Sequence, residues 1–267
     1  MVELSIFFCI SYYEGDIEWL RPYLKDNFVV YWKSNDIPPV WLNNKIVKTD
    51  NVGYNLHSYF TFIIDNYETL PEVVVFCKNN LVDRHMSIDV FSELIKRTTF
   101  TPLVDDNYFD KLSFPVSFMD NNSVYHEFND DWYSNKYPGK YFFKYNDFYN
   151  WAFKDKNRPI YLSFAPGGNY IVRRENILSR PREFYINLRN IISHSQLSLE
   201  SHFVERSLSA IWNSNIKHSC VLESVQDISL LKINAKLRNH ANNPEPLARL
   251  KNKAFLLIVR ALYRLFI

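Results

Sequence analysis

The stretch from Asn51 to Asn80 constrains the fold of this chain more than any other. Apolar residues recur at helical spacing from Leu56 to Tyr67, which predicts a helix with one continuous apolar face. Pro71 ends this helix, and the run Glu72–Cys77 follows with β-branched residues and no polar alternation. Such a run indicates a strand that is buried on both faces, as the strands of a parallel sheet are.

The segments before this stretch extend the same pattern. Leu4–Ile10 is an apolar run that predicts a central strand, and Asn27–Lys33 predicts a second strand. Asp16 is a suitable N-cap for a short helix between them, and Gly53 suits a sharp turn into the longer helix. This alternation predicts an α/β fold with a mostly parallel central sheet flanked by helices.

The later part of the chain divides into elements less clearly. A helix is predicted at Ser87–Lys96, and Thr99–Phe153 is aromatic and weakly patterned, so we interpret it as a long, mostly irregular insertion over the sheet edge. A strand at Ile160–Phe164 and helices at Pro181–Ile192 and Leu199–Trp212 follow. We therefore predict a main domain over residues 1–215 and a C-terminal helical region over residues 216–267.

Composition narrows the class of protein. The chain has 267 residues, of which 47% are hydrophobic, and this is enough for one substantial core. Its five glycines form no phosphate-binding loop of the P-loop or Rossmann kind. The three cysteines are isolated, which fits a reducing compartment without disulfides or a zinc site. No apolar run is long enough for a membrane span, and the N-terminus carries Glu3 and no basic segment, so we expect a strand there and not a signal peptide.

Polar residues follow two of the predicted strands at their carboxyl ends, where ligands bind in open α/β sheets. Ser11 follows the first strand, and the buried strand ends in a polar cluster at residues 78–80. Gly167 and Gly168 come after a later strand, at a place where the backbone must turn tightly or approach something closely. We expect one cleft to be lined by Ser11, Asn51, Lys78, Asn79 and Gly168.

The predicted helix Leu199–Trp212 carries two carboxylates on or near its apolar stripe. Glu200 falls within the stripe and Glu205 lies at its edge, so each needs a polar partner or a chemical role. Glu200 has a simpler alternative, which is an interaction with the helix dipole from the first turn. Glu205 has the alternative of a salt bridge at the rim of the helix.

Two histidines are candidates for a functional role. His57 lies one residue off the apolar stripe of its predicted helix, where a capping or packing role is the alternative. His85 lies in the polar loop after the buried strand. The other histidines do not form a metal-ligand spacing, and the absence of a Gly-x-Ser-x-Gly motif argues against a hydrolase.

One block of the chain matches the signature Asn-x-Gly-Arg-Glu-x-His-x-Tyr at Asn51, Gly53, His57 and Tyr59, whereas Tyr54 and Asn55 replace its Arg and Glu. Two further blocks follow in order, Gly167–Tyr185 and the pair Glu205-Arg206. Together the three blocks resemble a family of proteins of unknown function that is found in bacteria and fungi, and the resemblance extends roughly from Leu4 to Trp212.

The layout also resembles glycosyltransferases of the GT-A class, which implies a nucleotide-sugar donor and a catalytic domain over residues 1–215. In that class the first strand and its loop hold the nucleotide base, and an Asn-x-Gly loop leads into a helix beside the nucleotide. A later glycine-rich strand lies near the transferred sugar, and an acidic helix supplies the general base. The corresponding residues here are Ser11, Tyr12 and Glu14; Asn51, Gly53 and His57; Lys78, Asn79 and Asn80 at the end of the buried strand; Gly167, Gly168 and Asn169; and Glu200 or Glu205 as the base.

The chain departs from this class at its metal-binding motif. The Asp-x-Asp that is expected after the buried strand is replaced by Cys77-Lys78-Asn79-Asn80, which offers no carboxylate to a divalent cation. One alternative is that a nearby carboxylate substitutes, namely Asp83, Asp105 or Asp106. The other is that no metal is needed, and that Lys78 or Arg173 neutralises the diphosphate leaving group.

Two functions follow as hypotheses from these observations. The first is a glycosyltransferase that moves a sugar from a nucleotide-sugar donor to a surface-polysaccharide or lipid-linked glycan acceptor. The second is a noncatalytic nucleotide- or glycan-binding module of the same fold. The aromatic content of 17% suits platforms for sugars or bases, although a compositional bias of the genome explains it equally well.

The C-terminal tail is basic, whereas the rest of the chain is slightly acidic. After Glu245 the chain has five bases and no acid, and the remainder has 26 bases against 29 acids. This distribution argues against a body that binds nucleic acid. Leu250–Leu265 predicts an amphipathic helix with a basic stripe, so we expect it to bind an anionic membrane at the cytoplasmic face. A helix packed on the domain or on a second copy is the alternative.

Overall fold

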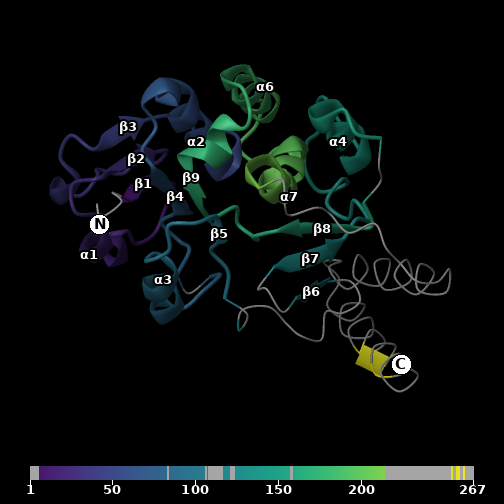
Figure 1. Ribbon diagram of the computed structural model, residues 1–267, viewed down its shortest axis with the longest axis horizontal. Helices are drawn as coiled ribbons and strands as arrows, with labels where there is room; N and C mark the ends of the chain where they lie inside the picture. The colour runs from purple at the N-terminus through teal and green to yellow at the C-terminus, as the bar shows by residue number, and fades with distance from the viewer. Residues whose placement is uncertain are drawn as a thin grey trace.

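The central element of the fold is a six-stranded sheet with the order β3-β2-β1-β4-β9-β5 (Figure 1). The computed structural model describes residues 6–82, 84–105, 107, 117–120, 124–156 and 159–213, together with residues 254, 257, 258 and 261. Neighbouring strands from β3 to β4 are parallel, and β9 runs antiparallel to both of its neighbours. The strands are β1 (Ile6–Tyr12), β2 (Phe28–Trp32), β3 (Ile46–Lys48), β4 (Val73–Lys78), β5 (Thr101–Pro102) and β9 (Tyr170–Arg173).

The central strands are buried on both faces, as their unbroken apolar runs predict. All six residues of β4 are buried. Its side chains alternate, so that Val74 and Phe76 belong to one core cluster while Val75 and Cys77 belong to the other. The polar residue that ends β4, Lys78, therefore lies on the same face as Val74 and Phe76.

Helices cover both faces of this sheet (Figure 1). One face packs against α2 (Tyr54–Asp65), α6 (Arg182–Ile192) and α7 (Leu199–Trp212), and the other against α1 (Arg21–Leu24) and α3 (Ile88–Leu94). The predicted α/β class with a mostly parallel, helix-flanked sheet is thus confirmed. The short helix α5 (Arg174–Leu178) and the 3-10 turns η1 (Glu18–Leu20), η2 (Val40–Leu42) and η3 (Tyr67–Thr69) connect these elements.

A second, smaller sheet corrects our interpretation of Thr99–Phe153 as mostly irregular. It is antiparallel, with the order β6-β7-β8, and it comprises β6 (Ser117–Met119), β7 (Tyr125–Phe128) and β8 (Tyr161–Phe164). A helix, α4 (Tyr145–Phe153), follows β7 and packs against α7. The strand predicted at Ile160–Phe164 is β8, whereas β6 and β7 were missed because they have three and four residues, which is too short for a clear hydrophobic period.

Most of the predicted C-terminal region lies outside the described residues. Ala254, Leu257, Ile258 and Ala261 are helical and exposed. Asp83 and Asp106, two of the carboxylates considered as metal ligands, also lie outside them. Among the residues that the structure describes, no helix combines the length and the apolar character needed to cross a membrane.

Candidate functional site

The strand order of the large sheet reverses between β1 and β4. From β1 the chain adds β2 and β3 on one side, and β4 then pairs with the other side of β1. Ligands of open α/β sheets bind outside the carboxyl ends of the strands at such a point. Ser11 and Lys78 face each other there as register partners at the ends of the two strands.

An inner pocket opens at this edge, with a volume of about 310 Å³. Four segments form it: the loop after β1, the end of β2, the N-terminus of α2 with the loop before α7, and the loop after β4. Its lining comprises Ser11, Tyr13 and Glu14; Lys33; Asn51, Tyr54 and Asn55 with Gln196 and Leu197; and Lys78, Asn79, Asn80 and Arg84.

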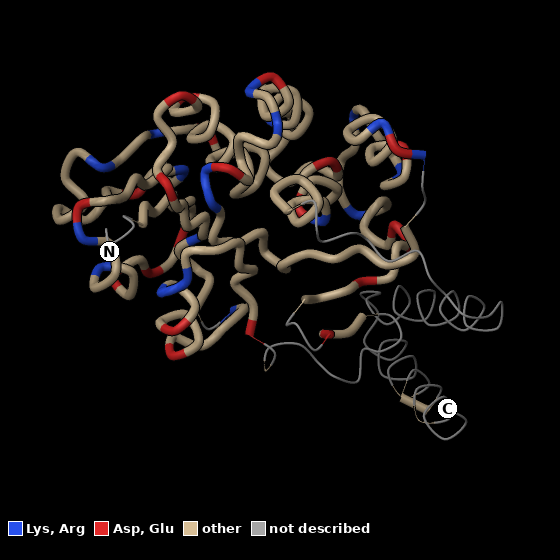
Figure 2. The backbone as a smooth tube through the Cα atoms, viewed as in Figure 1, with Lys and Arg blue, Asp and Glu red and all other residues tan. Residues whose placement is uncertain are grey.

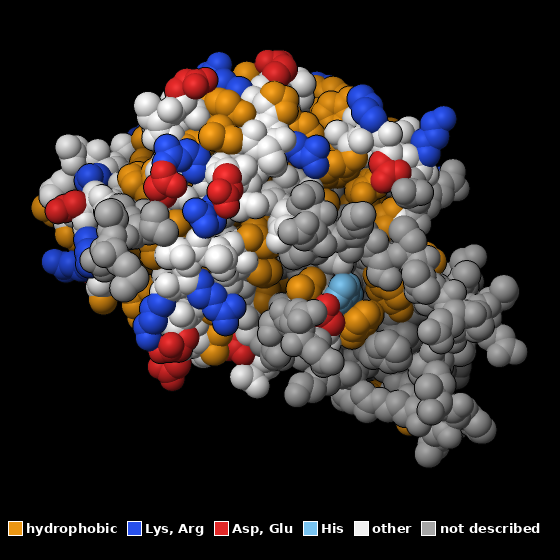
Figure 3. Space-filling view, viewed as in Figure 1, with side chains coloured by type: hydrophobic (Ala, Val, Ile, Leu, Met, Phe, Trp, Pro, Cys, Tyr) orange, Lys and Arg blue, Asp and Glu red, His pale blue; other side chains and the backbone are white. Residues whose placement is uncertain are grey.

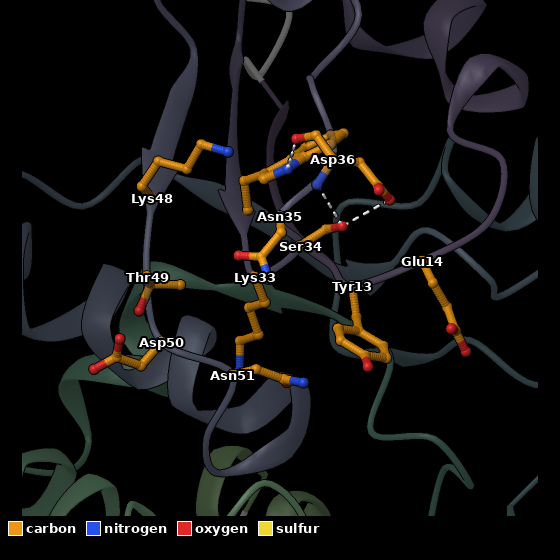
Figure 4. Close-up of a pocket in the computed structure, with 11 residues that line it drawn as sticks. Tyr13, Glu14, Lys33, Ser34, Asn35, Asp36, Lys48, Thr49, Asp50 and Asn51 are labelled. Atoms are coloured by element: carbon orange, nitrogen blue, oxygen red, sulfur yellow. Dashed lines mark hydrogen bonds between the residues drawn. The ribbon is translucent and has the colours of Figure 1, made fainter.

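An outer pocket of about 830 Å³ continues along the carboxyl ends of β2 and β3. It shares Tyr13, Glu14, Lys33 and Asn51 with the inner pocket, so the two form one cleft. Figure 4 shows the Lys33 side chain extending toward Asn51. The outer pocket is completed by Trp32, Ser34, Asn35, Asp36, Lys48, Thr49 and Asp50.

Lys78 is the buried cation of the inner pocket. It ends β4 and is only 4% exposed. Its Nζ donates a hydrogen bond to the phenol oxygen of Tyr54 at 2.8 Å. Burial, reinforced by the nearby charge of Arg84 and opposed by Glu205, lowers the pKa of Lys78 to about 7.

Lys33 is a second buried cation, placed directly after β2 and 8% exposed. Its Nζ donates hydrogen bonds to the backbone oxygens of Val52, at 2.8 Å, and Tyr54. Burial lowers the pKa of Lys33 to about 7. The two lysines thus contact Tyr54 from different sides, one through its backbone and one through its hydroxyl.

The loop before α2 is held in an unusual backbone conformation. Gly53 has a φ of +60°, and a Cβ there would lie 2.9 Å from His57 Cβ and from Ile192 Cγ1. The N–H of Gly53 donates to the carbonyl of Ser195, and that of Tyr54 to Gln196, both at 2.9 Å. A glycine is therefore required here, because it lets this loop pack on the segment before α7 and close one side of the inner pocket.

The turn between β8 and β9 lies directly against Lys78. Gly167 has a φ of +90°, and a Cβ there would lie 3.0 Å from Lys78 Nζ and from His85 Nε2. Asn169 Oδ1 accepts the backbone N–H of Lys78 at 3.0 Å, and Asn55 Nδ2 donates to the carbonyl of Gly167 at 3.0 Å. This turn thus lies beside the end of the buried strand, where we expected it.

Glu205 lies behind this turn. It is 7% exposed and accepts a hydrogen bond from the backbone N–H of Gly167. Burial raises the pKa of the Glu205 carboxyl, and the positive charges of Arg206 and Lys78 oppose that effect. Arg206 forms its shorter ion pair with Glu127, at 2.7 Å, and a longer one with Glu205, at 3.8 Å. Glu205 is therefore a buried carboxylate close to the inner pocket, with a pKa shifted toward neutrality.

Glu200 has a different environment on the same helix. One of its oxygens accepts the backbone N–H groups of residues 140, 141 and 142, at 2.8, 2.6 and 3.3 Å. The other lies 2.8 Å from Nε2 of His194. Burial raises the pKa of Glu200, but the hydrogen bonds from Tyr141, His194 and Lys140 outweigh it and leave the pKa lowered. These contacts account for the buried carboxylate as an anchor of the loop before α4.

The model of a family described as protein of unknown function (DUF3431) matches residues 9–226. The chain belongs to this family. Comparison with curated proteins found no match, and comparison with solved structures found none. The residues that the DUF3431 model matches thus include the large sheet from within β1 onward, the small sheet and the helices around the cleft.

Several residues predicted for the site of this DUF3431 protein line neither pocket. Tyr12 points to the opposite face of β1, where its ring stacks on Trp32 at 3.8 Å. Arg173 pairs with Val73 at the start of β4, the end of the strand that is remote from Lys78, and so it does not reach the inner pocket. His57 lies along α2 and does not line either pocket.

The other predicted residues are brought together. Six of them line the inner pocket, and Gly167 and Asn169 lie against Lys78. Gly168, which we expected to line the cleft, lines neither pocket, and a Cβ there would lie 3.3 Å from Leu208 Cδ1 and Leu56 Cδ2 and 3.4 Å from Asn55 Nδ2. The six are Ser11, Glu14, Asn51, Lys78, Asn79 and Asn80.

The described residues at the end of β4 do not fit a divalent cation. Lys78 is a cation itself, and Asn79 directs its amide nitrogen to the carbonyls of Glu14 and Asp16. Asp105 is used at the start of α3, where it accepts the N–H and hydroxyl of Ser87 at 3.1 and 2.9 Å. Within the described part of the chain, no three His, Cys, Asp or Glu side chains form a metal-binding group.

Sequence reasoning missed several residues of the DUF3431 cleft. Lys33 had a usable signal, because it is a polar residue at the end of a predicted strand, as Lys78 is. Tyr54 and Asn55 were noted only as departures from the signature Asn-x-Gly-Arg-Glu-x-His-x-Tyr that the sequence resembles. Gln196 and Leu197 had no signal, because the loop before α7 reaches the cleft only through tertiary packing on Gly53 and Tyr54.

Proposed function

We propose that this protein is a nucleotide-sugar-dependent glycosyltransferase. The observation that carries the proposal is that Lys78 and Glu205 both lie against Gly167, near the edge where the strand order of the α/β sheet reverses. A cation and a carboxylate beside one pocket suit a reaction in which an anionic group leaves and a hydroxyl loses a proton.

The arrangement of parts supports a GT-A-like interpretation of the fold. The loop after the first strand, the Asn-x-Gly loop, the end of the buried strand, the glycine-rich turn and the acidic helix are those that the resemblance implies. In this chain they all border one cleft or lie directly behind it. The outer pocket is the proposed place of the nucleoside, and the inner pocket that of the diphosphate and sugar.

The proposed step for an inverting transfer assigns one role to each side chain. The acceptor hydroxyl oxygen attacks the anomeric carbon of the donor sugar and gives its proton to the carboxylate of Glu205. The bond from that carbon to the diphosphate oxygen breaks, and its electron pair leaves with the nucleoside diphosphate. The cationic side chains of the inner pocket stabilise the charge that develops on the leaving group.

The proposed acceptor is a surface-polysaccharide or lipid-linked glycan, and the proposed location is the cytoplasmic face of a membrane. The basic tail supports this, together with Leu257 and Ile258, which are 51% and 55% exposed on a helix. Acidic and basic residues are interspersed along the described backbone in Figure 2 and over the face shown in Figure 3, so nucleic acid is left out of the proposed partners.

A thermal-shift screen against nucleotides and nucleotide sugars tests donor binding. A ligand at 100 times its Kd stabilises the folded chain by about 2.7 kcal/mol, which is readily detected. Release of nucleoside diphosphate is then measured with the ligand that stabilises best. The transferase predicts slow release even with water as the acceptor. The second candidate, a noncatalytic binding module, predicts a thermal shift and no release.

A further inference from the structure

Two buried lysines face the inner pocket without a carboxylate partner. Lys78 is 4% exposed and Lys33 is 8% exposed. Neither forms a salt bridge with any residue that the structure describes. A buried ammonium group without a counter-ion is strongly unfavourable, so charged groups of this kind are normally paired. The two lysines therefore mark a place that favours an anion.

Both lysines converge on the N-terminus of α2. Lys78 Nζ contacts the hydroxyl of Tyr54, and Lys33 Nζ contacts its backbone oxygen. The helix begins after Gly53, and no side chain caps it. The partial positive charge of a helix N-terminus adds to the two ammonium groups. Positive charge thus reaches the inner pocket from the ends of two strands and one helix.

We propose that the inner pocket binds a diphosphate group directly through Lys78 and Lys33, with no divalent cation between the protein and the phosphates. Lys78 stands where the GT-A resemblance implies a metal-binding aspartate. Of the three carboxylates considered as substitutes, Asp105 is the one that the structure describes, and it is engaged at α3. Ammonium groups make strong, charge-assisted hydrogen bonds with phosphate oxygens. The identity of the diphosphate as part of a nucleotide sugar rests on the proposed function.

Diphosphate binding is coupled to proton uptake. Burial lowers the pKa of each lysine to about 7, so above pH 7 each side chain is neutral in most molecules that have no bound anion. A bound anion favours the charged form, so binding above pH 7 takes up protons and weakens as the pH rises toward 9. The charged and titratable groups around the pair are Tyr54, Arg84, His85 and Glu205 for Lys78, and His57, Asp50 and Arg189 on the side of Lys33.

Isothermal titration calorimetry of the full chain, in EDTA, tests the proposal with inorganic pyrophosphate and with nucleoside diphosphates. Both are expected to bind, and Mg²⁺ or Mn²⁺ is expected to change the Kd by less than about threefold. Lys78→Met and Lys33→Met are each expected to raise the Kd at least about tenfold. Lys45→Met is the matched control, because Lys45 contacts the carbonyl of Asp26 and lines neither pocket.

Binding that appears only with a divalent cation would overturn the proposal, as would an unchanged Kd in both lysine variants. A second measurement needs no variant. Titration at pH 8 in two buffers of different ionisation enthalpy reports the protons taken up, and uptake approaching one proton or more is expected. No uptake contradicts the proposal even if a lysine variant fails to fold.

The outcome is separable from that of the proposed function. Sugar transfer that requires a divalent cation overturns the direct lysine contact and leaves the transferase in place. Lysine-dependent pyrophosphate binding in EDTA, without release from any nucleotide sugar, supports the diphosphate site and rejects the transferase.

Discussion

Glu200 and Glu205 share one helix but have opposite environments. Both oxygens of Glu200 are engaged, one by backbone N–H groups and one by His194, and its pKa is lowered. Glu205 accepts the N–H of Gly167, and burial raises its pKa. A carboxylate with a raised pKa near a pocket is suited to accept a proton at neutral pH, whereas a saturated one is suited to hold a loop.

We predict that Glu205→Gln keeps the fold and lowers the transfer rate by about two to four orders of magnitude, the usual worth of general-base help. Glu200→Gln is the matched control. It is expected to leave the rate of the folded enzyme unchanged and to lower the free energy of unfolding by about 1–3 kcal/mol, because charge-assisted hydrogen bonds are lost. Initial rates and urea denaturation measure both effects. A Glu205→Gln variant with the wild-type rate would mean that the base lies elsewhere.

The lowered pKa of Lys78 predicts that the free energy of unfolding depends on pH. This pKa is lowered to about 7 in the folded chain, from the ordinary lysine value of 10.5. Between these values the unfolded chain binds more protons, so the free energy of unfolding rises with pH from about 7 to 10. Lys78→Met should remove this contribution. Urea denaturation across this range measures the difference between the two proteins, and parallel curves would show that Lys78 is not desolvated in the folded state.

At this scale the sequence predicts the polar residues at strand ends best. Ser11, Lys78 and Asn79 line the inner pocket, and each lies at the end of a strand that its apolar run identifies as buried. Lys33 obeys the same rule and could have been predicted with them. Arg173 was proposed by analogy for the leaving group, but the antiparallel direction of β9 takes it to the other end of the sheet.

The turn between β8 and β9 is the element that connects the cation with the carboxylate. Gly167→Ala is expected to displace Lys78, because a Cβ would lie 3.0 Å from its Nζ, and to weaken donor binding at least about tenfold. Gly15→Ala is the control. Gly15 has a similar φ, +93° against +90°, but a Cβ there would meet only Asn79 Nδ2, at 3.8 Å.

Both alanine variants therefore carry a similar backbone strain, and only one disturbs Lys78. Thermal denaturation should show a loss of stability in both variants, and a larger one in Gly167→Ala, where the Cβ would also lie 2.8 Å from Asn169 Nδ2 and 3.0 Å from His85 Nε2. Titration with the donor should show the larger loss of affinity in Gly167→Ala. Equal affinities would mean that the turn does not position Lys78.

Helices and strands with a long hydrophobic pattern are predicted from the sequence, whereas the short strands are not. The helix at Leu199–Trp212 has the predicted bounds, and β4 is shifted by one residue from Glu72–Cys77. The missed strands β3, β5, β6 and β7 have two to four residues each, too few for a period to be recognised. The direction of β9 was also beyond prediction, because it depends on how the small sheet returns the chain to β4.

The whole molecule combines a cleft at one edge of the large sheet with a basic C-terminal segment. Of that segment, only Ala254, Leu257, Ile258 and Ala261 are described, as exposed helical residues. The sequence places basic residues on one stripe beside an apolar face. Each base near an anionic leaflet contributes about 1 kcal/mol, so four or five of them together are enough for reversible binding.

We predict that the full chain co-sediments with liposomes that contain anionic lipid, and that a truncation after Asn243 does not. Neutral liposomes are the control, because an electrostatic contribution is lost without anionic lipid. Equal sedimentation of the two proteins would reject membrane binding by the tail and favour a helix packed on the domain or on a second copy.

Release of nucleoside diphosphate from a panel of nucleotide sugars, in the presence of EDTA, tests the central claim most directly. The full chain is predicted to release it from at least one donor faster than a protein-free control, and Glu205→Gln and Lys78→Met are predicted to lose most of that rate. Release from no donor, either in EDTA or with added Mg²⁺ or Mn²⁺, although one of them stabilises the chain, would contradict the transferase and favour a binding module. Release that is unchanged in both variants would contradict the assignment of the site.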